Sequence, residues 1–192
     1  GEWPNDTDPK QSYTILNCGS LLPKPVREGY LFEGWQDDTG NYIDFLPLPE
    51  NLKNLSLQAC WIQGTEGILI SNGIVNDYNG AESNIIIPET YREVPVSEIG
   101  SSAFKDCDTI KSVKLHNNII TIGDEAFSNC VFLENIQIPL STLHISETAF
   151  IGCVSLTKVS TSAALAKILA QQLTNLQKVI VTSGNSIAES TF

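Results

Sequence analysis

Three of the five cysteines recur at a fixed interval, and they are the residues best spaced for chemistry. Cys107, Cys130 and Cys153 lie 23 residues apart. Regularly spaced thiolates can ligate a metal or take part in redox reactions. The sequence has no Cys-x-x-Cys pair, however, and neither His116 nor His144 falls at ligand spacing to a cysteine. We therefore predict a column of buried thiols that pack as small apolar side chains, with no metal site and no cofactor.

The sequence motifs of catalysis are missing. It contains no G-x-S-x-G, no H-E-x-x-H, no P-loop and no Gly-rich dinucleotide fingerprint. The two histidines are expected at a strand end or in a loop, without a nucleophile partner. Asp37–Asn41 has the composition of a calcium loop but lacks its length and its distal Glu, so we interpret it as a hairpin turn. We expect a non-catalytic protein.

Each of these three cysteines is the last residue of one copy of a repeated segment, and the fold of that segment must position the cysteine. Ile99–Cys107, Ile122–Cys130 and Ile145–Cys153 read approximately I-G-x-x-A-F-x-x-C, and apolar residues continue past each cysteine at L-x-x-V-x-L spacing. A fixed period in the twenties predicts a solenoid in which each repeat stacks on its neighbours. Each turn should give one short parallel strand and then return along the opposite side. Phe127 should lie in the core between two neighbouring repeats.

The outward positions of the predicted strands form a candidate binding surface, because solenoids commonly bind through the exposed face of their sheet. These positions contain no carboxylate, although the chain has 22 acidic and 11 basic residues. A polar, mildly basic strip could take an acidic peptide or a glycan; alternatively, short polar residues simply suit an exposed strand. The predicted binding residues are Ser112, Lys114, Asn135, Gln137, Lys158, Ser160, Lys178 and Ile180, with Asn84 and Ile86 on the first strand.

The net charge of -11 argues against nucleic acid or an anionic membrane as the partner, because phosphate binding needs clustered Lys and Arg. No stretch of about 18 apolar residues occurs, so we expect no membrane insertion. The chain opens on Gly1 without a Met, and we interpret it as a fragment of a longer protein. The missing signal peptide then has no bearing on export.

The N-terminal part predicts a small β domain. Residues 1–12 read as a mobile lead-in, and residues 13–64 contain short alternating segments, among them Tyr13–Leu16 and Gly29–Trp35. Tyr30 and Phe32 should share one strand face. Trp35 and Trp61 are expected in the core, and stacking on a sugar is the alternative. Cys18 and Cys60, on the first and last strands, could form a disulfide if their Cα atoms approach within about 7 Å.

Residues 65–192 are assigned to the solenoid. Two short strands are predicted within Ile68–Val75, and an insertion of five residues within Tyr91–Val96 should bulge from the first repeat. Ala163–Leu173 has a helical pattern. Ser186–Phe192 repeats the opening of Thr121–Phe127, which predicts a further copy. That copy would leave an open apolar end near Ile187 and Phe192, where the protein could self-associate.

Two family resemblances follow from these residues. The segment from Ile85 to Val159, with its I-G-x-x-A-F-x-x-C units, resembles the BspA-type leucine-rich repeat. Residues 13–62, with Gly29–Trp35 and Leu57–Trp61, resemble the Listeria-Bacteroides repeat of internalin-type surface proteins. Together they imply a mainly β protein, a β-grasp-like domain followed by a leucine-rich-repeat solenoid with a parallel sheet on one face.

The resemblance also implies a role and a location. It suggests a secreted, extracellular protein of a bacterial cell surface, an adhesin whose solenoid binds a protein or glycan ligand on host or neighbouring cells. The alternative is a structural stalk that displays another domain.

Overall fold

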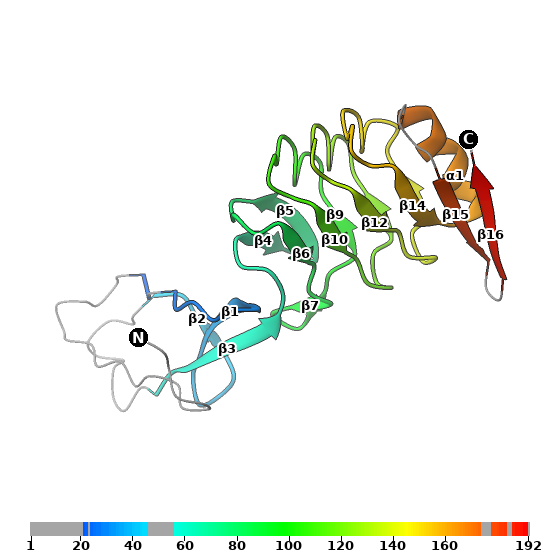
Figure 1. The fold of residues 1–192 in the computed structure, drawn as a ribbon. Coiled ribbons are helices and arrows are strands. Elements are labelled where there is room, and N and C mark those ends of the chain that lie inside the picture. Colours follow the sequence, from blue (N-terminus) through cyan, green and yellow to red (C-terminus); the bar gives the residue numbers. More distant parts are fainter. Residues whose placement is uncertain (1–20, 23, 46–55, 174–177, 184–185, 192) are drawn as a thin grey trace.

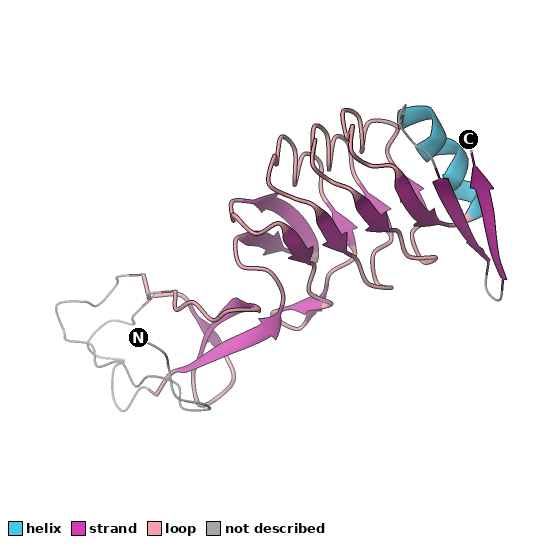
Figure 2. Ribbon diagram, in the orientation of Figure 1, coloured by secondary structure: helices cyan, strands magenta, loops and turns pink. Residues whose placement is uncertain are grey.

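The computed structural model describes residues 21–22, 24–45, 56–173, 178–183 and 186–191, with side chains as far as residue 173. A small three-stranded sheet lies at one end, and a coil of stacked turns forms the body (Figure 1). Within the described residues the only helix, α1 (Ala163–Gln172), covers the far end of that coil (Figure 2). The fold is mainly β, as predicted.

The N-terminal sheet contains β1 (Tyr30–Gln36), β2 (Tyr42–Ile43) and β3 (Gln58–Gln63), all antiparallel in the order β2-β1-β3. The turn between β1 and β2 is the predicted hairpin. Asp37 Oδ1 accepts the backbone N–H groups of Thr39 at 2.9 Å and Asn41 at 3.0 Å. A short polar side chain that bonds to nearby backbone N–H groups in this way stabilises a tight turn.

Tyr30 and Phe32 pair with Gln63 and Trp61 in the regular part of the register, so they share one face of β1 as predicted. Tyr30 is 37% exposed, whereas every residue from Leu31 to Trp35 is buried. A bulge between Phe32 and Gly34 adds one residue, which reverses the side-chain alternation beyond Phe32. Phe32 and Trp35 consequently share a face, and the ring centroid of Phe32 lies 5.7 Å from that of Trp35 and 5.3 Å from that of Trp61. Trp35 is buried in the small core of this sheet, as predicted, and Trp61 is half-buried and packs against that core.

The body begins with a hairpin of β4 (Ile68–Ser71) and β5 (Ile74–Tyr78), which confirms the two predicted strands. Asn72 and Gly73 form the turn with positive φ angles of 52° and 74°. Such a pair matches the right-handed twist of the flanking strands. The hairpin starts one of the two sheets of the coil.

Two sheets then run along opposite sides of the coil, and each is parallel apart from one antiparallel pair, β15–β16 in the longer and β4–β5 in the shorter. The longer has the order β16-β15-β14-β12-β10-β6, and the shorter has the order β13-β11-β9-β5-β4. The longer sheet contains β6 (Asn84–Ile86), β10 (Ser112–Lys114), β12 (Asn135–Gln137), β14 (Lys158–Thr161) and β15 (Lys178–Ser183). The shorter contains β9 (Glu98–Ile99), β11 (Thr121–Ile122) and β13 (His144–Ile145).

The core between the sheets is a ladder of aromatic rings. Phe104, Phe127 and Phe150 are fully buried, with successive ring centroids 5.1 and 5.2 Å apart and planes within 7°. Tyr78 continues the ladder at 5.6 Å from Phe104. Its hydroxyl donates to the Glu82 carbonyl at 3.2 Å, which gives a polar end to the ladder.

The thiol column is present and is also hydrogen-bonded. Cys130 and Cys153 are buried and Cys107 is half-buried. The Cys130 thiol donates to the Phe104 carbonyl, and the Cys153 thiol donates to the Phe127 carbonyl, each at 3.0 Å. Each thiol therefore ties its own turn to the preceding one. Cys18 lies outside the described residues, so its disulfide with Cys60 stays a prediction.

The insertion in the first repeat forms a small hairpin of β7 (Thr90–Tyr91) and β8 (Val94–Pro95). Its turn residues, Arg92 and Glu93, have positive φ angles of 49° and 66°. Side chains other than Gly and Asn rarely occupy this region, so the turn must be held by its surroundings.

Contacts of Arg92 with the N-terminal sheet supply that support. Its backbone N–H and Nε donate to Glu33 Oε1 and to the Glu33 carbonyl, both at 2.8 Å, and its guanidinium forms an ion pair with Asp44 at 2.5 Å. The guanidinium also lies 4.8 Å from the Tyr42 ring centroid. Gly34 leaves the space, because a Cβ there would lie within 2.9 Å of both Tyr42 and Arg92. We call this set of contacts the Arg92 clamp.

The C-terminal end of the coil is closed differently from our expectation. β16 (Ser186–Thr191) turns back and pairs antiparallel with β15. The residues between these strands in the sequence, Gly184 and Asn185, are a pair that favours two-residue hairpin loops. In the structure, Ser186–Thr191 therefore does not follow the parallel course of the strands before it.

Candidate binding face and junction pocket

The predicted binding residues form two columns across the longer sheet. The register pairs Asn84 with Ser112, Ser112 with Asn135, and Asn135 with Lys158; in the second column it pairs Ile86 with Lys114, Lys114 with Gln137, and Gln137 with Ser160. Lys178 and Ile180 continue the two columns on β15, where side chains are not described. We call the ten positions of these columns the strip.

The two lysines of the strip with described side chains are available to a ligand. Lys114 and Lys158 are exposed, and within the described residues neither forms an ion pair. They lie two strands apart, about 10 Å at the usual spacing of strands. Asn84 and Ser112 are hydrogen-bonded to each other at 2.7 Å. The strip therefore offers separated cationic groups between short polar side chains.

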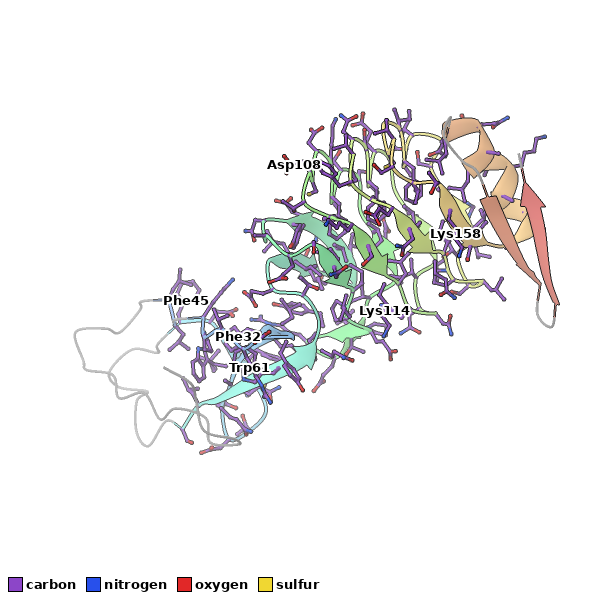
Figure 3. The ribbon with its side chains drawn as sticks, in the orientation of Figure 1. Phe32, Phe45, Trp61, Asp108, Lys114 and Lys158 are labelled. Atoms are coloured by element: carbon purple, nitrogen blue, oxygen red, sulfur yellow. The ribbon has the colours of Figure 1, made fainter. Side chains whose placement is uncertain are left out.

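The carboxylates of the repeats gather elsewhere. Figure 3 shows Lys114 and Lys158 on the sheet side of the coil and Asp108 among the turns at another side. In these turns Lys105 pairs with Glu125 at 2.7 Å, and Asn129 donates to Asp106 at 2.8 Å. The charge of the coil is thus unevenly distributed, with its unpaired sheet-side lysines away from the acidic turns.

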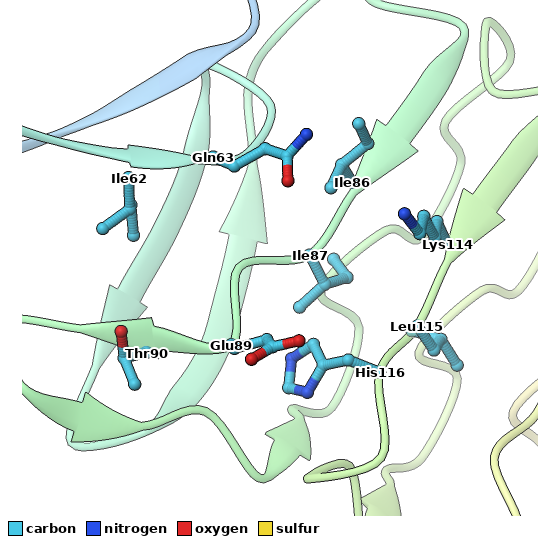
Figure 4. Close-up of a pocket in the computed structure, with 9 residues that line it drawn as sticks. All are labelled: Ile62, Gln63, Ile86, Ile87, Glu89, Thr90, Lys114, Leu115 and His116. Carbon is cyan, nitrogen blue, oxygen red and sulfur yellow. The ribbon is translucent and has the colours of Figure 1, made fainter.

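A pocket lies at the β6 end of the strip, where the N-terminal sheet meets the coil (Figure 4). Its volume is about 370 Å³, within the range of about 300 to 1,000 Å³ usual for ligand sites. Three segments contribute its walls: the end of β3, the chain from β6 into β7, and the end of β10. The lining residues are Ile62, Gln63, Ile86, Ile87, Glu89, Thr90, Lys114, Leu115 and His116.

The pocket contains both an anionic and a cationic side chain beside a neutral imidazole. Burial lowers the pKa of His116, while the Pro88 carbonyl and the Glu89 carboxylate act in the opposite direction. His116 Nδ1 accepts the Asn118 N–H at 3.3 Å, so the proton of the neutral ring lies on Nε2. At neutral pH the charges of the pocket are therefore those of Lys114 and Glu89.

The pocket and the Arg92 clamp were not predicted from the sequence, although one signal pointed to them. The number of residues from Ile87 to Ile99 is larger than the number from Leu115 to Ile122. The extra residues form the hairpin that supplies both Arg92 and the Thr90 side of the pocket. The insertion showed where the repeat departs from its pattern, but not what it contacts.

Among the described residues, no group of three or more His, Cys, Asp or Glu side chains is arranged to hold a metal ion. The same part of the chain contains no helix of the length and apolarity needed to span a membrane.

Residues 78–192 match the family of the BspA type leucine-rich repeat region, in six copies. This match covers more than half of the chain. The chain belongs to the BspA-type leucine-rich-repeat family. The match does not extend to residues 13–64, so the internalin-type repeat there stays a prediction. Comparison with curated proteins gives no match.

Three solved structures resemble this BspA-type chain. A leucine-rich repeat protein from Bacteroides capillosus is 19% identical over 62% of this chain and 100% of that one, with a TM-score of 0.50. The leucine-rich repeat protein of T. pallidum is 28% identical, with a TM-score of 0.44 over 46% of this chain and 44% of that one. A leucine-rich cell surface protein from Faecalibacterium prausnitzii is 21% identical, with a TM-score of 0.42 over 58% and 36%.

The first of these three likenesses agrees with the leucine-rich-repeat fold. The chain spans less than half the length of the T. pallidum and F. prausnitzii proteins.

Proposed function

We propose that this BspA-type chain is a non-catalytic adhesin of a bacterial cell surface, and that the strip binds an acidic protein or glycan of a host or neighbouring cell. The observation that carries the proposal is the placement of Lys114 and Lys158. Both are exposed without an ion pair among the described residues, in a chain of net charge -11. The columns hold no acidic residue from β6 to β15, and the first one is Glu189, which pairs with Ile180 on the edge strand β16.

Electrostatics and geometry give this face its selectivity. A ligand carboxylate or sulfate beside Lys114 or Lys158 would gain a charge-assisted hydrogen bond, whereas the acidic turns repel the same group from other surfaces. The flat, polar columns between the lysines allow an extended chain to lie across several strands. Attraction of this kind steers association and weakens as salt increases.

The test uses the whole chain against extracellular-matrix proteins and a glycan array. For any hit, Lys114→Glu combined with Lys158→Glu should abolish binding without lowering the melting temperature. The control is Lys105→Glu with Lys167→Glu, which changes the net charge equally at exposed positions outside the strip. Binding that survives the first double variant, or that falls equally in both, would exclude the strip as the site.

The Arg92 clamp favours a second candidate, a structural stalk. A fixed junction between the N-terminal sheet and the coil suits a spacer that holds another domain at a set distance. In a stalk, no ligand would depend on the strip, so the same screen separates the two functions.

A further inference from the structure

The junction pocket continues the strip, because Ile86 and Lys114 belong to both. They are the first two residues of the second column of the strip, which continues with Gln137 and Ser160. A chain lying along this column toward β6 therefore reaches the pocket mouth. The pocket is where such a ligand would meet aliphatic side chains after a run of polar ones.

Hydrogen bonds fix the walls of the pocket. The Ile86 N–H donates to Thr65 Oγ1 at 2.7 Å, and the Thr65 N–H donates to the Ile86 carbonyl at 3.1 Å. The Ile87 N–H bonds to the Lys114 carbonyl at 3.2 Å. The pocket also depends on β3 and on the inserted hairpin, and neither accompanies the later turns of the coil. It is thus a particular feature of the first turn and not a product of the repeat.

The lining indicates the class of ligand. Five of the nine lining residues are polar and four are aliphatic, and no Phe, Tyr or Trp contributes. Ile87 is 3% exposed, so the aliphatic surface of the pocket comes from Ile62, Ile86 and Leu115. Protein sites for sugars commonly place an aromatic ring against the apolar face of the sugar, whereas aliphatic walls accept a Leu, Ile or Val side chain. The composition therefore favours a peptide over a glycan.

The two charges of the pocket orient that peptide. Lys114 belongs to the strip, so it attracts acidic groups to the mouth, while Glu89 repels a carboxylate from the side of the pocket formed by β7 and the residues before it. An acidic segment would therefore leave its carboxylates over the strip and insert an uncharged side chain.

From this arrangement we infer that the pocket holds an aliphatic anchor residue of an acidic protein segment, whose carboxylates lie along the strip. This inference rests on the proposed function of the strip and deepens it, because it makes the partner a protein.

The probes are fluorescent dodecapeptides of Glu and Ser, each with a single Leu at a different one of the twelve positions. The parent peptide has the same composition without Leu. A labelled sulfated dextran serves as the glycan-like probe. Anisotropy titrations with the whole chain at low salt give each affinity. Leu at one or two positions should strengthen binding about tenfold over the parent, as expected for burying one aliphatic side chain.

Ile86→Asn should remove the gain from Leu, so that every Leu peptide binds this variant no more tightly than the peptide without Leu does. The matched control, Gln137→Asn, lies in the same column outside the pocket and should retain the gain. Ile62→Thr, which changes another wall within β3, should reproduce the loss if Ile86→Asn lowers the melting temperature.

Several outcomes would overturn the inference while leaving the strip as a binding face. One is that every Leu peptide binds like the parent, with the parent still weakened by Lys114→Glu and Lys158→Glu. Another is that the gain survives both wall variants, and a third is lysine-dependent binding of the dextran but of no peptide. Binding of neither probe class would count against the strip and the pocket together.

Discussion

At the scale of single residues, Phe127 is enclosed by aromatic rings on both sides. It is fully buried, and parallel rings of neighbouring turns cover both of its faces at 5.1 and 5.2 Å. Dense packing on two sides prevents the surroundings from collapsing into a space left by truncation. Removing this ring would therefore weaken the packing at two interfaces between turns.

We expect Phe127→Ala to lower the free energy of unfolding by about 3 to 5 kcal/mol, measured by urea denaturation of the whole chain. Phe132→Ala is the matched control, because Phe132 lies in the next segment of the same turn and is 53% exposed. Its effect should stay within about 0.5 kcal/mol. Similar losses in the two variants would contradict the assignment of Phe127 to the ladder.

The placement of single residues could be predicted from the sequence where a residue type recurred in the repeats. Phe127 and the cysteine column followed from the 23-residue period, because a repeated apolar position must face the shared core. The bulge in β1, which places Phe32 and Trp35 on one face, was not predicted because this segment occurs once. A bulge beside Gly34 reverses alternation without a signal in the pattern itself.

At the scale of elements, α1 takes the place of the backbone turn that follows each of the earlier Phe residues. In the inner turns the Phe104 and Phe127 N–H groups bond to carbonyls of the following turn, at Ala126 and Ala149. The Phe150 N–H has no such turn and donates instead to Gln172 Oε1 at 3.0 Å, while Gln172 Nε2 donates to the Ser146 carbonyl at 2.8 Å. One side-chain amide thus replaces the backbone of the next repeat, and Leu165 and Leu169 fill its core positions.

We expect Gln172→Leu to lower the free energy of unfolding by about 1 to 3 kcal/mol, because it leaves a partly buried N–H and C=O without their partner. Gln171→Leu, at the adjacent exposed position of α1, is the control and should change stability by about 0.5 kcal/mol or less. Hydrogen exchange should show faster exchange of the Phe150 amide in the first variant alone. Unchanged protection of that amide would rule out the capping role of Gln172.

The helix itself was predictable, since Ala163–Leu173 has helical spacing, but its capping amide was not. A glutamine on a helix surface has no distinctive pattern, and its role depends on a turn that precedes it by more than twenty residues. For the same reason β16 was assigned to a further repeat. The seven residues resemble the repeat, yet in the structure Ser186–Thr191 pairs antiparallel with β15.

At the scale of the whole molecule, the Arg92 clamp joins the N-terminal sheet to the coil. Burial raises the pKa of Tyr42 to about 12, and the nearby Glu33 carboxylate acts in the same direction, so the phenol stays neutral within the clamp. Arg92 in turn lowers the pKa of Asp44, chiefly through their hydrogen bond. The ion pair of Arg92 and Asp44 is thus a charge-assisted contact across the junction.

We expect Arg92→Ala to let the two parts move independently, because it removes the ion pair and the Nε bond to Glu33, which together contribute about 1 to 3 kcal/mol to docking. Small-angle X-ray scattering should show a broader distribution of interatomic distances. Arg27→Ala is the control, since Arg27 stacks on Tyr30 within the N-terminal part at 4.2 Å. Identical scattering by Arg92→Ala and the parent would refute the clamp.

The same clamp should respond to acid. Because the pKa of Asp44 in the folded protein lies below its ordinary value of 3.8, its contribution is complete above that value and is lost as the pH falls through the lowered pKa. Scattering should therefore be constant from neutral pH down to about pH 5 and should broaden only below about pH 4. Asp44→Asn should abolish this acid-dependent step.

The Gln172 amide also bears on how such a protein can change through evolution. The cap meets the array only at its final turn, and the junction pocket and Arg92 clamp meet it only at the first. Duplication of one 23-residue unit between them would extend the sheet by about 4.8 Å and leave both ends as they are. Each duplication would also add two outward positions to the strip. The length of the proposed binding face could therefore change in evolution through the number of repeats, without any change in the two end structures.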